Sequence, residues 1–71
     1  IYPNPASDYI NINTEKIKSS NIYDLQGKLM KSIDCKDDIT NVNISDFAKG
    51  VYFIETFDNK YNKNKTKLVV D

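Results

Sequence analysis

The sequence predicts an all-β fold, a small sandwich of about six strands. Three observations predict this class. Short apolar segments alternate with a period of two, and β-branched and aromatic residues are concentrated in them. Turn-forming residues separate these segments at intervals of roughly 8 to 12 positions, and no segment has the period of a helix. A chain of 71 residues forms one domain with a thin core, because it buries only about 60% of its extended surface.

The first half of the chain predicts three strands. In "YINI", Ile10 and Ile12 share one face, and a second strand covers about residues 21–24. "DLQGK" then turns the chain, with Gly27 at the position where a hairpin needs positive φ. "KLMKSI" returns antiparallel, and the polar segment "DCKDD" is a loop.

The second half predicts three further strands, "ITNVNI", "VYFIETF" and "KTKLVV". "SDFAKG" predicts a short helical turn that covers one end of the sheets, with Phe47 pointing inward. "VYFIETF" is apolar on both faces, which predicts a central strand. The sequence does not decide which face of this strand is in the core, the face with Val51 and Phe53 or the face with Tyr52 and Ile54. "DNKYNKN" is a polar hairpin loop.

Composition argues against several function classes. The 10 lysines balance 10 acidic residues, there is no Arg, and the net charge is zero. The bulk attraction to nucleic acid or to an anionic membrane that a basic domain has is therefore absent. Every apolar run is too short for a transmembrane helix or the core of a signal peptide, so we expect no direct membrane insertion.

Side chains that carry catalysis are scarce. The chain has no His, the commonest general base and metal ligand, and Cys35 is its single cysteine. Asp34, Asp37 and Asp38 lack the alternating ligands, the turn glycine and the terminal Glu of a calcium loop. A solvated acidic loop explains them better. We expect no enzymatic activity, no metal and no cofactor.

Three features offer binding surfaces, each beside a simpler structural explanation. The aromatic residues suggest a sugar- or peptide-binding face, with Tyr9 and Tyr61 expected to be the most exposed, although packing explains most of them. The basic stretch 60–67 is typical of a solvated hairpin protected against edge aggregation. "KLVVD" predicts a last strand at a sheet edge, accessible to a partner by strand addition or pocket capture.

Four segments, in this order, resemble one known family. They are "YPNPASD" at 2–8, "IYDLQGK" at 22–28, "ISDFAKGVYFIE" at 44–55 and "KLVV" at 67–70. Together they resemble the C-terminal sorting domain, type A, of the type IX (Por) secretion system. The resemblance covers essentially the whole chain. One departure is Phe47, where the family most often has Leu; an apolar plug is kept.

The resemblance implies an immunoglobulin-like β-sandwich of six to seven mostly antiparallel strands. It implies that residues 1–71 are a single C-terminal domain of a longer secreted protein. The outer-membrane translocon would recognise the folded domain in the periplasm and export the covalently attached upstream cargo. A sortase-like peptidase commonly removes such domains, and the cargo is secreted or held at the cell surface. The domain itself would have no activity.

The family's motifs map the recognition elements onto eleven residues of this chain. They are Pro3, Asn4, Pro5, Asp24, Gly27, Gly50, Tyr52, Lys67, Leu68, Val69 and Val70. Two other functions remain open. A generic binding or spacer module, for example one that binds carbohydrate, would depend on exposed aromatic residues such as Tyr9 or Tyr61. A self-association module would pair through "VYFIETF" or through the last strand.

Overall fold

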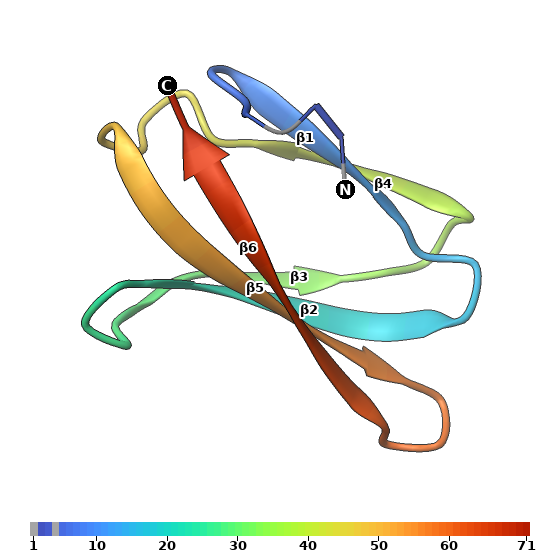
Figure 1. The fold of residues 1–71 in the computed structure, drawn as a ribbon. Helices are drawn as coiled ribbons and strands as arrows, with labels where there is room; N and C mark the ends of the chain where they lie inside the picture. Colours follow the sequence, from blue (N-terminus) through green and yellow to red (C-terminus); the bar gives the residue numbers. More distant parts are fainter. Residues whose placement is uncertain (1, 4) are drawn as a thin grey trace.

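The computed structural model describes residues 2–3 and 5–71. It contains six strands in two antiparallel sheets (Figure 1), which confirms the predicted all-β sandwich. No helix occurs in the described ranges. The strands are β1 (Tyr9–Asn13), β2 (Ile17–Asp24), β3 (Leu29–Asp34), β4 (Ile39–Asn43), β5 (Gly50–Asp58) and β6 (Lys63–Val70).

The two sheets differ in size. β1 pairs with β4 in the smaller sheet, and the larger sheet has the order β3-β2-β5-β6. β5 therefore has a hydrogen-bonded neighbour on each side, as its apolar sequence predicted, whereas β3 and β6 form the edges. β2 begins at Ile17, four residues before the predicted start. Within its polar segment "KSSN", Ser19, Ser20 and Asn21 still pair with both β3 and β5, because the ladder is made by backbone groups.

The core lies between the sheets and is built from alternating residues. Across the larger sheet Ile22 pairs with Ile54, and Tyr52 pairs with Leu68. Of the two possible core faces of β5, the structure selects the one with Tyr52 and Ile54. The buried apolar residues are Ala6, Ile10, Ile12, Ile22, Val42, Ile44, Tyr52, Ile54, Leu68 and Val70.

The turn between β4 and β5 differs from the predicted helical turn. Phe47 N–H donates to Ile44 O at 2.9 Å, which closes a single hydrogen-bonded turn without a helix. The Asn43 side chain accepts from the N–H and from the hydroxyl of Ser45, at 2.8 and 2.7 Å. This local bond competes with helix nucleation, which is costly over so few residues. The inward position of Phe47 is confirmed, since its half-buried ring packs against the core.

Candidate functional site

The motif segments singled out in the sequence meet at one end of the sandwich. In the β5–β6 ladder, Gly50 lies opposite Val70 and Tyr52 lies opposite Leu68. In the β2–β5 ladder, Tyr52 also lies opposite Asp24. Three motifs that are distant in the sequence are thus held on neighbouring positions of one sheet.

The N-terminal segment joins this end of the molecule to both sheets. Tyr2 exchanges two backbone hydrogen bonds with Asn11 of β1, at 3.0 and 2.7 Å. Ala6 then bridges to the end of β6: its N–H donates to Val69 O at 2.9 Å, and its carbonyl accepts from Asp71 N–H at 2.8 Å. The N-terminal motif segment therefore lies beside the last motif, "KLVV", at the β6 edge of the larger sheet. Pro3 and Pro5 are exposed between these two anchors, and Asn4 lies outside the described residues.

The last strand is an edge strand, as predicted, but only part of it is available to a partner. The bridge from Ala6 covers its final residues. Leu68 and Val70 are 0% and 3% exposed, so their side chains belong to the core. Lys67 is exposed and Val69 is half-buried, and these two side chains alternate onto the outer face of the sheet.

Tyr52 serves as a buried brace at the start of β5. Its hydroxyl donates to Ala48 O at 2.7 Å, and its ring lies 5.0 Å from the Phe47 ring in a tilted arrangement. Only 6% of the residue is exposed. This is the geometry of the tyrosine corner of immunoglobulin-like sandwiches, in which a Tyr near a strand start bonds the backbone a few residues upstream. Gly50, with φ of 150°, lies exposed between the two halves of the corner.

The β2–β3 turn is held by Asp24. One of its carboxylate oxygens accepts from the N–H groups of Gln26 and Lys28, each at 2.9 Å. Gly27 has φ of 86°, which confirms the positive φ predicted there. Both motif residues of this turn thus have a direct conformational role.

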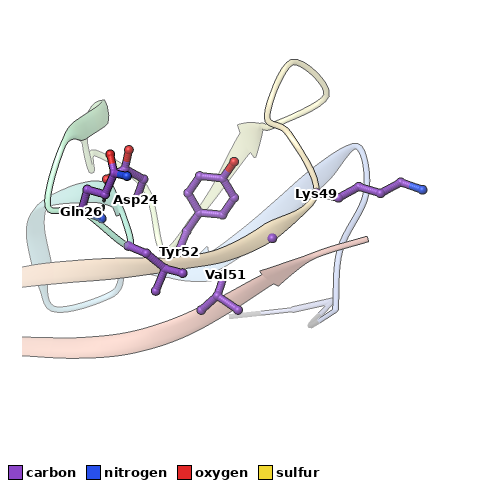
Figure 2. Close-up of a pocket in the computed structure, with 7 residues that line it drawn as sticks. Asp24, Gln26, Lys49, Val51 and Tyr52 are labelled. Carbon is purple, nitrogen blue, oxygen red and sulfur yellow. Dashed lines mark hydrogen bonds between the residues drawn. The ribbon is translucent and has the colours of Figure 1, made fainter.

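A shallow hollow of about 260 Å³ separates this turn from the start of β5. Figure 2 shows Asp24 and Gln26 on one wall, with the Tyr52 ring and Val51 on opposite sides of the strand. The Lys49 side chain extends away from Asp24. Because Asp24 is already engaged by the turn, the hollow offers shape and apolar surface for a partner's side chain, without a nucleophile beside a base.

Titratable groups elsewhere are dispersed. Within residues 2–3 and 5–71, no three Cys, Asp or Glu side chains converge as a metal site requires. Burial raises the pKa of the half-buried Cys35 thiol, which disfavours the reactive thiolate. The same ranges hold no helix with the length and apolarity needed to cross a bilayer.

Two contributors to the site escaped the sequence analysis. Ala6 and the carbonyl of Ala48 form the contacts that hold the motifs together, yet neither has a distinctive side chain. For Ala48, the spacing in "AKGVY" was an available signal, because it places a backbone acceptor four residues before a strand-starting Tyr. Ala6 offered no such signal, since its partners are distant in the sequence.

This arrangement defines a β-sandwich in which the N-terminal segment is hydrogen-bonded to the last strand, and in which the motif segments lie on one surface. Residues 1–71 match the family described as secretion system C-terminal sorting domain, and the chain belongs to that family. The predicted family resemblance is therefore confirmed.

Two curated relatives are similar to nearly the whole chain. Beta-agarase A of Zobellia galactanivorans is 34% identical over 73 residues, which cover 99% of this chain and 13% of the agarase. Beta-agarase D of the same organism is 30% identical over 70 residues, covering 99% of this chain and 14% of the relative. The chain thus spans about one-seventh of the length of each relative. No solved structure matches it.

Proposed function

We propose that this sorting domain is a non-catalytic targeting signal, which directs an upstream cargo across the outer membrane by the type IX secretion system. The translocon reads the folded domain in the periplasm, and a sortase-like peptidase then removes it from the secreted or surface-held cargo. The single observation that supports this proposal is the convergence of all four motif segments on one end of the sandwich. A receptor can contact one such surface at once, whereas scattered motifs would need several contact sites.

The motif residues divide into two groups by exposure. Tyr52, Leu68 and Val70 are buried, so they act through the shape they impose. Asp24 is half-buried and Gly27 is exposed, but both set the conformation of the β2–β3 turn, so we also assign them a role in shape. We assign the direct contacts to the receptor to the surface group, which consists of Pro3, Pro5, Gly50, Lys67 and the half-buried Val69. Asn4 belongs to the predicted recognition set but lies outside the described residues.

This division matters for the design of a test. Deleting residues 67–71 would abolish export, but it would also remove Leu68 and Val70 from the core. Loss of export in the deletion variant could then result either from unfolding of the domain or from loss of recognition by the receptor. Substitutions of the surface group keep the core intact, and surface changes usually alter stability by less than about 0.5 kcal/mol.

The experiment places the domain behind a fluorescent reporter directed to the periplasm of a host that has the secretion system. The test variant is Pro5→Ala and Lys67→Ala combined. We expect its reporter to stay in the periplasm while circular dichroism shows the wild-type melting curve. The matched control is Lys63→Ala, which removes an exposed lysine from the same face of β6 at the opposite end. The control variant should be exported like the wild type.

Either of two results would contradict this assignment. Wild-type export of the folded double variant would show that the receptor does not contact these surface residues. Export of the wild-type fusion in a host without the translocon would show that the domain is not addressed to that system.

A further inference from the structure

The hairpin between β5 and β6 has features that the sorting motifs do not explain. It projects from the sandwich at the end opposite to the end of β6 that meets the N-terminal segment (Figure 1). Its tip, residues 58–63, presents Tyr61 with 82% of its surface exposed and φ of 65°. A non-glycine residue in this left-handed conformation is uncommon, and an exposed tyrosine ring gains little from packing there.

The tip is held rigidly by Asp58. One carboxylate oxygen accepts from the N–H groups of Lys60 and Asn62, both at 2.8 Å, and the other accepts from the Asn62 side chain at 3.1 Å. These hydrogen bonds, the Asn62 N–H first, lower the pKa of the Asp58 carboxyl. The carboxylate therefore serves the turn, and the Tyr61 ring is displayed by a fixed backbone.

Lysines from separate elements surround the tip. Lys18 of β2 places its Nζ 5.7 Å from the centre of the Tyr61 ring. Lys16, from the turn before β2, lines a hollow of about 290 Å³ together with Lys60, beside the Asp58 carboxylate. Lys63 Nζ lies 3.5 Å from Glu55 Oε2. This ion pair is diagonal across the β5–β6 ladder, in which Lys63 lies opposite Phe57. The zero net charge of the chain conceals a small local excess of positive charge at this end. Lys16, Lys18, Lys60 and Lys63 contribute four ammonium groups beside three carboxylates, those of Glu15, Glu55 and Asp58.

We propose that the hairpin tip binds the phosphate groups of an anionic lipid surface. Tyr61 lies at the level of the headgroups, where tyrosine rings are favoured. The ammonium groups of Lys16 and Lys60 contact headgroup phosphates from the rim of the hollow, because the Asp58 carboxylate in its lining repels anions. An exposed aromatic ring among flexible ammonium groups fits this interface. Nucleic-acid recognition fits it less well, because no guanidinium fork is present.

This inference does not depend on the sorting role, since the tip and the motif surface lie at opposite ends of β5 and β6. It gives the domain a second contact that orients it against a membrane while its motif surface stays accessible to a receptor.

The test uses the whole 71-residue chain with Tyr61→Trp as a probe, because the sequence has no other Trp. The tryptophan emission is followed during titration with phosphatidylcholine vesicles, with or without phosphatidylglycerol. We expect a blue shift and partition only with the anionic vesicles, weakened by added salt. Lys16→Gln with Lys60→Gln should reduce the partition coefficient by about 30-fold.

The matched control is Lys28→Gln with Lys49→Gln, which removes the same charge from the motif end and should leave partition within about twofold of the probe protein. A parallel titration with inorganic phosphate separates a lipid surface from the free ion. Three outcomes would overturn the proposal: no partition into anionic vesicles, equal losses in both double variants, or a response to inorganic phosphate alone.

Discussion

Removing the Tyr52 hydroxyl tests whether the corner at the start of β5 is a structural brace. In the Tyr52→Phe variant the ring, and its contact with Phe47 at 5.0 Å, are kept, while the 2.7 Å hydrogen bond to Ala48 O is lost. A hydrogen bond of this kind contributes about 1 kcal/mol to the free energy of unfolding. A domain of this size has a total of only about 3–5 kcal/mol, so the variant loses a substantial fraction.

The assay is thermal and urea unfolding followed by far-UV circular dichroism. A loss of about 1 kcal/mol lowers Tm by about 4–8 °C in a domain of this length, with the urea m-value unchanged. Tyr61→Phe is the matched control, because its ring is 82% exposed and its change in stability should stay within about 0.5 kcal/mol.

The same variant connects stability with export. Because Tyr52 is buried, Tyr52→Phe should leave the surface of the motif end unchanged and should be exported at temperatures where it is folded. Equal stability of Tyr52→Phe and the wild type would refute the brace. Loss of export by the fully folded variant would show instead that the hydroxyl itself is read by a receptor.

Three further predictions concern the turns and the thiol. Gly27→Ala should cost about 1–2 kcal/mol because an L-side chain is strained at φ of 86°, and Gly27→Asn should cost less in the same denaturation assay. The pKa of Asp58 is lowered in the folded state, so its stabilising contribution is present above about pH 4 and is lost as the pH falls through the folded pKa. The difference in Tm between the wild type and Asp58→Ala should therefore decrease as the pH falls from about 4 through the folded pKa of Asp58. A difference that increases on acidification would contradict the lowered pKa. Cys35 should react with iodoacetamide with an apparent pKa above that of an unfolded cysteine, and a midpoint at or below the unfolded value would contradict the effect of burial.

The predicted recognition set combines two kinds of residue that a sequence motif cannot distinguish. Lys67 and Leu68 are neighbours in "KLVV", yet one is exposed and the other is completely buried. Any substitution survey of these positions should therefore pair each export measurement with a measurement of folding. Only substitutions of the exposed members report on contact with a partner.

The sequence by itself determined the class of fold, the family and most of the strands. Period-2 alternation in "YINI" and "VYFIETF" is a local pattern, and it correctly placed Ile10 and Ile12 on one buried face. Gly27 was equally readable, because positive φ is a property of a single residue and its turn. The early start of β2 was not readable, since "KSSN" has no apolar pattern and forms a strand only because two neighbours pair with its backbone.

Tertiary structure alone decided which residues of the motifs face outward and how the motifs meet. By sequence, Tyr52 and Phe53 are equally suited to the core, and only the packing of the second sheet against one face of β5 determines that Tyr52 is buried. The bridge from Ala6 to Val69 and Asp71 joins the two ends of the chain, and no local pattern encodes so distant a pairing. The physical reason is the same in both cases. The local backbone sets the alternation of side chains between the two faces of a strand, whereas burial and edge pairing depend on which distant segment packs against that face or edge.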